Sequence, residues 1–151
     1  MANDQTILVL TDFSKISNRA TDIALELALN NQKDLLIYNS IISIEASVLT
    51  GERRSSVEEI AAKTSTSKSN LKQVVDRITA NLSTLQRSKI NITSKEGMGA
   101  PMETILNLVT EYNIWMVVMG NHDDPQMSNR YSDTNVPLIT NNCGCPVLLV
   151  P

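Results

Sequence analysis

Short runs of consecutive apolar residues alternate with longer amphipathic segments along the chain. The runs that predict buried strands are residues 7–10, 35–38 (extendable to 42), 114–119 and 147–150, and the alternating residues 90–93 predict a further short strand. Strands that are apolar at nearly every position are typical of a parallel sheet covered on both faces.

Between these runs, apolar residues recur at helical spacing. The segments that predict helices are residues 14–30, 71–85, 101–112 and 133–142. Ser14 or Ser17 is suited to cap the first helix, and Pro101 is suited to the first position of the third. In the second helix the apolar face comprises Leu71, Val74, Val75, Ile78, Leu82 and Leu85.

The middle of the chain has the weakest pattern. Residues 43–56 indicate a loop, and a helix can begin within residues 57–62, but the Ser- and Thr-rich residues 64–70 disfavour its continuation. The structure of residues 43–70 is therefore left open. Residues 97–99 predict a turn.

The alternation of strands and helices predicts one α/β domain over residues 1–151, with a parallel sheet between two helical layers. In such sheets ligands bind beyond the carboxyl ends of the strands. Three segments should meet there: Thr11-Asp12, Asn39-Ser40 and residues 119–123. An aspartate at the end of a strand is more often a turn or cap residue than a ligand-binding group.

Composition narrows the class of protein. The chain has 151 residues, 42% hydrophobic and 19% charged, with 13 Lys and Arg against 16 Asp and Glu for a net charge of −3. Such mild acidity and the 3% aromatic content argue against a nucleic-acid-binding protein. Neither a signal peptide nor an apolar stretch of about 18 residues is recognisable. We therefore expect a cytoplasmic protein that does not enter membranes.

Candidate reactive side chains are few. His122, the single histidine, adjoins Asp123 and Asp124, but a metal centre or a catalytic triad needs further partners, and we expect a solvated loop histidine. Cys143 and Cys145 could bind a metal or change redox state; without a second pair for zinc we expect two packing thiols. No nucleophile–base set, paired carboxylates or Walker-type loop is recognisable, which predicts no catalysis.

Three stretches carry a resemblance to a known family. They are the opening ILVLTDFSKISNRATDIALELA, the segment VVMGNH and the closing CPVLLVP. Together they resemble the first strand and helix, the fourth strand with the start of the phosphate loop, and the last strand of the universal stress protein family. The resemblance implies an adenine-nucleotide alpha-hydrolase-like fold, a three-layer α/β sandwich with a five-stranded parallel sheet in the order 3-2-1-4-5.

Nucleotide-binding members of that family carry a loop of the form Gly-x2-Gly-x9-Gly-Ser/Thr. At this spacing the present chain has Gly120, Asp123, Asp133 and Thr134, so aspartates replace two of the three glycines. Each replacement adds a side chain where the backbone would curl around phosphate, and a negative charge beside a polyanion. Two unit charges ~4 Å apart at an effective dielectric near 20 repel by about 4 kcal/mol. The degenerate loop therefore predicts that ATP is not bound in the family's usual mode.

The resemblance also implies a vestigial pocket. Asp12 matches the family's nucleoside-contacting aspartate, Met119 and Gly120 match the pocket floor, and Thr134 keeps the hydroxyl of the loop. Ser40 stands where the family usually has a small apolar residue. The expected pocket residues are Asp12, Ser40, Met119, Gly120, Asp123, Asp133 and Thr134. A nucleoside or a neutral small molecule could still fit, and no metal is required.

These features predict a stress-response or regulatory protein that is not an enzyme and has no cofactor. Family members often dimerise through the last strand, so we expect a homodimer built on residues 146–151, together with an unidentified protein partner. The alternative is a sensor that still holds ATP or another adenine nucleotide, with slow hydrolysis. Asp123 and Asp133 distinguish the two hypotheses.

Overall fold

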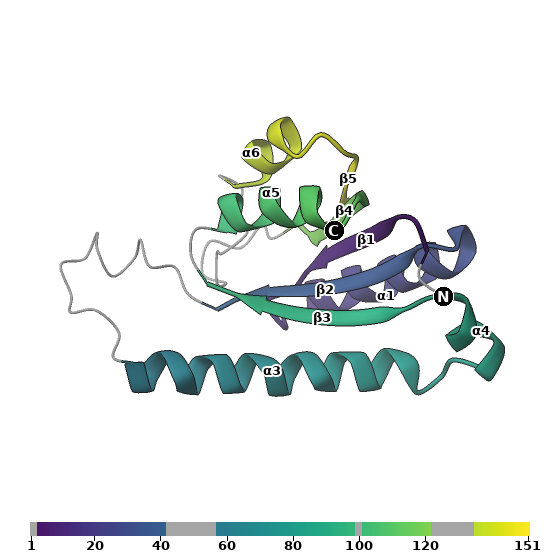
Figure 1. Ribbon diagram of the computed structural model, residues 1–151, viewed down its shortest axis with the longest axis horizontal. Coiled ribbons are helices and arrows are strands. Elements are labelled where there is room, and N and C mark those ends of the chain that lie inside the picture. The colour runs from purple at the N-terminus through teal and green to yellow at the C-terminus, as the bar shows by residue number, and fades with distance from the viewer. Residues whose placement is uncertain (1–2, 42–56, 99–100, 122–134) are drawn as a thin grey trace.

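Helices cover both faces of a central sheet in the computed structural model (Figure 1). The structure describes residues 3–41, 57–98, 101–121 and 135–151. The strands are β1 (Thr6–Leu10), β2 (Asp34–Ser40), β3 (Ile92–Gly97), β4 (Ile114–Gly120) and β5 (Val147–Val150). The helices are α1 (Lys15–Asn31), α3 (Val57–Thr79), α4 (Thr84–Lys89), α5 (Pro101–Glu111) and α6 (Asn135–Asn142).

The sheet is parallel throughout and has the strand order β3-β2-β1-β4-β5. This confirms the predicted five-stranded sheet and its order. β1 is the central strand, with Leu8 opposite Leu36 of β2 and Val117 of β4. Its residues from Ile7 to Leu10 are fully buried, which explains why these four consecutive positions are apolar rather than alternating with polar ones.

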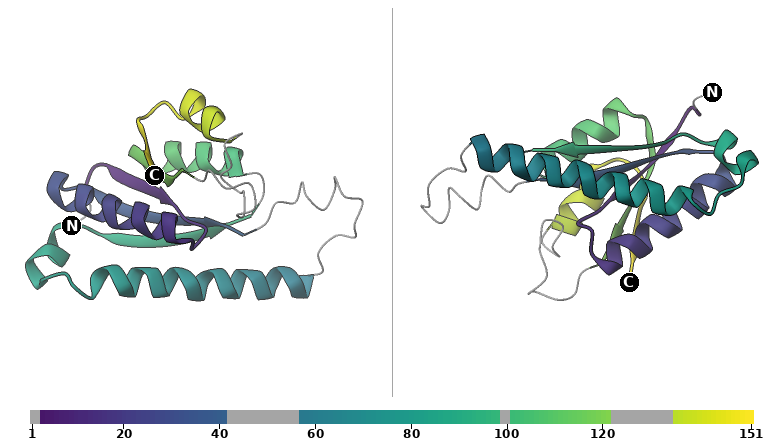
Figure 2. Two further views of the ribbon diagram at one scale, coloured as in Figure 1. Left: turned by 180° about the vertical axis from the view of Figure 1, so that it is seen from behind. Right: turned by 90° about the horizontal axis from the view of Figure 1, so that it is seen from below.

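Two apolar clusters hold the layers together. On one face, Ile7 and Val9 of β1 pack with Ala20, Ala24 and other residues of α1 and α3. On the other, Leu8 and Leu10 pack with residues of α5 and α6. Figure 2 shows the same arrangement from behind and from below, with α5 and α6 on the face opposite α1 and α3. The alternation of side chains along β1 thus feeds both cores.

The predicted boundaries of the first helix hold closely. Ser14 is the N-cap of α1, and its hydroxyl accepts a hydrogen bond from the Ser17 N–H at 3.2 Å. Of the two predicted capping residues, Ser14 therefore takes the role. Pro101 begins α5 as expected.

The structure decides the part of the middle of the chain that the sequence left open. Residues 57–79 form one continuous helix, α3, through the Ser- and Thr-rich stretch that disfavours a helix locally. Thr64 and Thr66 donate their hydroxyl hydrogens to the carbonyls of Ile60 and Ala62, four residues earlier, so these side chains bond within the helix instead of competing with it.

The predicted helix over residues 71–85 ends earlier than expected. α3 stops at Thr79, and Ser83 caps the separate helix α4 through a capping box with Gln86. Leu85, expected on the buried face, is 67% exposed. The Ser83-x-x-Gln86 pattern was the signal in the sequence for this second helix start.

The third strand is also displaced from its predicted position. β3 spans Ile92–Gly97 rather than residues 90–93, and Gly97, expected in a turn, pairs with Ser40 as the last residue of the strand. The ladder with β2 extends the strand through polar residues that carry no alternating pattern.

Candidate functional site

The carboxyl ends of β1, β2 and β4 lie side by side at one edge of the sheet. Because β1 pairs with β2 on one side and with β4 on the other, this edge holds the topological switch point at which α/β sheets bind ligands. Asp12 follows β1, Ser40 ends β2, and Met119 and Gly120 end β4. The other residues predicted for the loop lie outside the described part of the chain: His122, Asp123, Asp124, Asp133 and Thr134.

Asp12 shapes the turn between β1 and α1. Its Oδ1 accepts hydrogen bonds from the Ser14 N–H at 3.0 Å and from the Ser17 hydroxyl at 2.6 Å. The Ser17 hydroxyl oxygen in turn accepts from the Asp12 N–H at 3.3 Å. A carboxylate is stabilised at this position by the N–H groups at the start of a helix. One oxygen of Asp12 thus serves the local turn, as expected for an aspartate at a strand end.

Phe13, within the same turn, has a left-handed backbone with φ of +65°. This conformation costs a residue with a Cβ roughly 1–2 kcal/mol. The Phe13 N–H donates to the Thr11 hydroxyl at 3.0 Å, and the bond from Ser14 to Asp12 spans the same residue. The turn is therefore held from both sides, and it fixes the direction in which α1 leaves the sheet.

Gly120 has a packing role that its sequence context did not predict. A Cβ at this position would overlap Cγ2 of Ile16 in the first turn of α1. The absence of a side chain lets α1 lie close against the end of β4. The same close approach of backbone was expected to serve a phosphate, so the glycine has a structural reason that needs no ligand.

The predicted pocket residues do not all face the same side of the sheet. Met119 is fully buried in the cluster beneath α5 and α6, and Ser40, buried at the end of β2, follows Leu36 and Tyr38 of that cluster at alternate positions. Gly120 faces α1 instead. The four described residues share an edge of the sheet, but Met119 and Ser40 lie on the α5–α6 face, whereas Gly120 adjoins α1 on the other.

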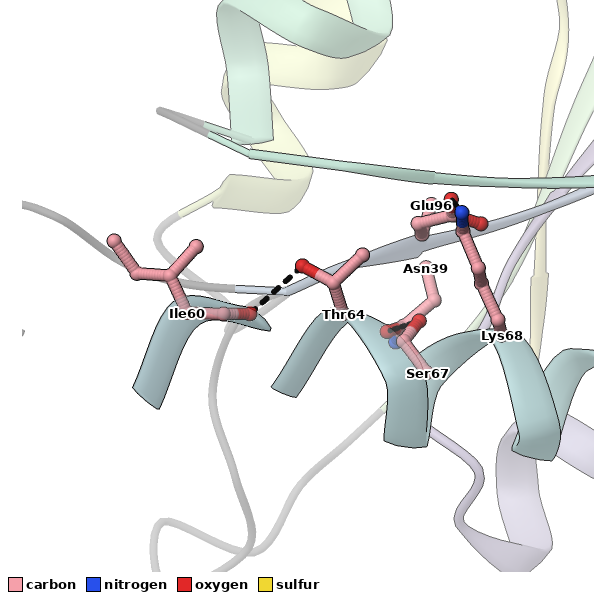
Figure 3. A network of polar contacts seen from close by, with 6 residues as sticks. All are labelled: Asn39, Ile60, Thr64, Ser67, Lys68 and Glu96. Atoms are coloured by element: carbon pink, nitrogen blue, oxygen red, sulfur yellow. Dashed lines mark hydrogen bonds and ion pairs between the residues drawn. The ribbon is translucent and has the colours of Figure 1, made fainter. Parts of the chain in front are cut away.

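A buried polar network joins α3 to this edge (Figure 3). The Ser67 hydroxyl of α3 donates to Oδ1 of Asn39 at 2.8 Å, and the Asn39 amide donates to the Thr11 carbonyl at 2.7 Å. Asn39 and Ser67 are 1% and 4% exposed. The network connects α3, β2 and the end of β1 just before Asp12, so it positions the switch point from the side of α3.

Ser67 was not identified from the sequence as a buried polar residue, although the spacing of its neighbours indicates it. It lies four residues before Leu71 and continues the spacing of Leu71, Val74 and Ile78, all of which are buried. Helical periodicity therefore places it on the inner face of α3. The next residue of the helix, Lys68, forms an ion pair with Glu96 of β3, with 3.5 Å between Nζ and Oε1.

Tyr38 of β2 is fully buried on the α5–α6 face, two residues before Ser40. Its pKa is raised above 10.0, first by burial and further by the neighbouring Glu96 carboxylate. Gly97 leaves room for the Tyr38 hydroxyl, which a Cβ at that position would overlap. The phenol stays protonated at neutral pH and is unsuited to act as a general base.

A separate groove of about 240 Å³ lies between α1 and α3. It is lined by Phe13, Asn18, Asn70, Gln73, Val74 and Arg77. Arg77 is already engaged in an ion pair with Asp22 at 2.8 Å. The groove includes none of the predicted pocket residues, so it is a different surface from the switch point.

Two further observations concern the described residues alone. No group of three or more His, Cys, Asp or Glu side chains gathers there as metal ligands would. Within the same residues, no helix combines the length and the apolar character needed to span a membrane.

The fold and the switch point define a class of protein. It is a doubly wound, parallel α/β protein, in which ligands bind at the carboxyl end of the central strand. Comparison with solved structures agrees. Universal stress protein UspA from Lactobacillus plantarum superposes with a TM-score of 0.72 at 17% identity, with all of both chains covered. A universal stress protein in complex with cAMP gives 0.68 at 21% identity, with 97% of each chain covered.

A third structure, the universal stress protein from Archaeoglobus fulgidus in complex with dAMP, gives a TM-score of 0.58 at 15% identity, with both chains fully covered. No curated protein matches the sequence. The model of the universal stress protein family matches residues 4–151. The chain therefore belongs to the universal stress protein family, as the resemblance implied.

Proposed function

We propose that this universal stress protein is a regulatory protein of the stress response that acts through its own dimer and a protein partner. It does not bind ATP in the family's usual mode and does not catalyse a reaction. The observation that carries the proposal is the pair Asp123 and Asp133 at two of the three glycine positions of the phosphate loop.

Charge and backbone freedom both act against a triphosphate at these positions. If each aspartate contributed half of the ~4 kcal/mol repulsion of two charges ~4 Å apart, affinity would fall at least tenfold per site, because about 1.4 kcal/mol is one decade. The hydrogen bonds of Asp12, at the carboxyl end of β1, add to this argument. Oδ1 of Asp12 already accepts two hydrogen bonds from the start of α1.

The experiment begins with the nucleotide content of the purified protein, released by denaturation, and continues with calorimetric titration of ATP and magnesium. We expect no stoichiometric nucleotide and no micromolar binding. The double variant D123G/D133G should gain affinity for ATP. The matched variant D123N/D133N removes the same charges without restoring glycine, so it separates repulsion from backbone freedom. Co-purified ATP, or micromolar affinity of the unaltered chain, would overturn the proposal.

The second candidate is a sensor of adenine nucleotides. It is favoured by the two similar structures that were solved in complex with cAMP and with dAMP, both of which are monophosphates. A monophosphate brings less negative charge to the aspartates than ATP does. Parallel titrations with AMP, cAMP and ATP distinguish the candidates, since binding of a monophosphate alone supports this one. An assay for released phosphate tests hydrolysis by the same samples.

The proposed dimer is built on β5, an edge strand. The four residues of β5 are all aliphatic, whereas β3, at the opposite edge, carries Thr93, Ser94, Lys95 and Glu96. Charged residues protect a sheet edge from pairing, and aliphatic ones leave it open to a second copy. This asymmetry supports residues 146–151 as the interface.

Light scattering of the variant Leu148→Lys tests this geometry. We expect the mass to fall from that of a dimer to that of a monomer. Thr93→Lys places the same charge on the exposed opposite edge and should leave the dimer unchanged. Circular dichroism confirms that both variants fold. A dimer that persists in folded Leu148→Lys would contradict the interface.

A further inference from the structure

A pair of thiols lies on the turn between α6 and β5, away from the switch point. Cys143, 6% exposed, follows α6, and Cys145, partly exposed, lies two residues before β5. The Cys145 Sγ donates a hydrogen bond to the Cys143 Sγ at 3.8 Å. The Cys143 Sγ lies 3.3 Å from the Cys145 carbonyl oxygen and donates to it. The two sulfur atoms therefore already face each other.

The turn between the thiols is shaped for closure. Gly144 is exposed and has φ of +71°, and apart from its two chain neighbours no residue has an atom within 4 Å of the position that a Cβ would take. Two extended residues span about 7 Å, and a bend brings the Cα atoms toward the roughly 4.4–6.8 Å range of disulfides. The sulfur atoms need to approach from 3.8 Å to about 2.0 Å. Because Gly144 is exposed and has no side chain, the middle of the turn can adjust as the two sulfur atoms approach.

We propose that Cys143 and Cys145 form a reversible intramolecular disulfide when the protein meets a peroxide. The Cys143 sulfur loses its proton and attacks the O–O bond, which forms a sulfenic acid and releases one oxygen as water. The Cys145 sulfur then attacks the sulfenic sulfur, the S–O bond breaks, and the hydroxide leaves with the Cys145 proton as water. Two thiols and one hydrogen peroxide thus give one disulfide and two waters, with two electrons passing to the peroxide.

The assignment of the two roles follows from the hydrogen bond. Cys145 is the donor in the contact between the two sulfur atoms, so the Cys143 thiolate that attacks the peroxide keeps this hydrogen bond, and Cys145 supplies the resolving thiol. Burial, together with the contact with Cys143, raises the pKa of Cys145 from 9.0 to about 12. Cys145 therefore keeps its proton at neutral pH until the second step releases it.

The experiment uses the full chain, reduced with a dithiol, freed from it and treated with hydrogen peroxide. Remaining thiols are alkylated, and the protein is digested with trypsin. The last basic residue before the pair is Arg130, so both cysteines lie in one fragment, residues 131–151. We expect this fragment to lose two hydrogen atoms in mass, to resist alkylation, and to regain both thiols with a dithiol.

Intramolecular closure should dominate over linkage between chains. The two sulfur atoms of one chain already lie 3.8 Å apart, so closed fragments should outnumber linked ones. Cys143→Ser and Cys145→Ser serve as controls, and neither can lose two hydrogens within one fragment. A fragment that stays fully alkylated, gains oxygen instead, or links mainly to a second fragment would overturn the proposal. None of these readouts depends on nucleotide binding.

Discussion

Replacing Ser67 with alanine tests whether the buried network stabilises the switch point. The Ser67 hydroxyl donates to Asn39 Oδ1 at 2.8 Å, and both residues are almost completely buried. Ser67→Ala leaves that amide oxygen without this donor, which costs about 1–3 kcal/mol. Alanine returns up to about 0.7 kcal/mol through its higher helix propensity. The expected net loss is about 1–2 kcal/mol, or a decrease of roughly 2–8 °C in Tm.

The control is Ser69→Ala, two residues along the same helix on an exposed position. It gains the same helix propensity and loses no buried contact, so its free energy of unfolding should be unchanged or slightly higher. Urea unfolding, followed by circular dichroism, compares the two variants directly. The difference between them isolates the buried hydrogen bond from the intrinsic preference of the helix.

A double-mutant cycle with Asn39→Leu completes the test. When the amide is already absent, Ser67→Ala should cost less than it does in the unaltered chain, and the coupling energy should exceed about 0.5 kcal/mol. If Ser67→Ala is as stable as Ser69→Ala, or if the cycle shows no coupling, the inference that this bond anchors α3 to β2 is wrong.

Three further predictions concern packing, pH and surface charge. Gly120→Ala places a methyl group on Ile16 and should cost about 1–3 kcal/mol in urea unfolding, with partial recovery on adding Ile16→Ala; an unchanged free energy would contradict the packing role. Because burial raises the pKa of Cys145 from 9.0 to about 12, its contribution to stability is complete below pH 9 and is lost as the pH rises toward 12. The free energy of unfolding should decrease over that pH range, and the decrease should be smaller in the variant Cys145→Ala. Equal pH profiles of the two proteins would contradict this role of the Cys145 thiol. Arg77→Ala breaks an exposed ion pair with Asp22 and should cost less than about 1 kcal/mol, an effect that salt removes, whereas a larger and salt-insensitive loss would indicate a structural role.

The continuity of α3, which the sequence left open, and the misplaced bounds of β3 have a common physical cause. The Ser- and Thr-rich stretch has weak local preference for a helix, and its continuity depends on Leu71, Val74 and Ile78 packing against the sheet. β3 similarly extends over polar residues because β2 supplies its hydrogen-bonding partner. Local pattern cannot report a partner that is distant in the sequence.

The candidate site, too, was predictable from the sequence only in part. The ends of the strands could be located from their apolar runs, so the sequence placed Asp12, Ser40 and Gly120 at one edge correctly. It could not show that Gly120 faces Ile16 or that Ser40 lies on the opposite face, since these depend on how α1 and α5 pack.

The sequence by itself determined where the strands lie along the chain and that most of them are buried on both faces, because continuous apolar runs are local properties of the chain. The resemblance carried by the turn after β1 and by the closing strand implied the family and, through it, the order of the strands in the sheet. Only the tertiary structure decided the length of α3, the buried bond from Ser67 to Asn39 and the meeting of the two thiols. Each of these depends on side chains brought together by packing, and packing is fixed by the whole sheet rather than by neighbours in the sequence.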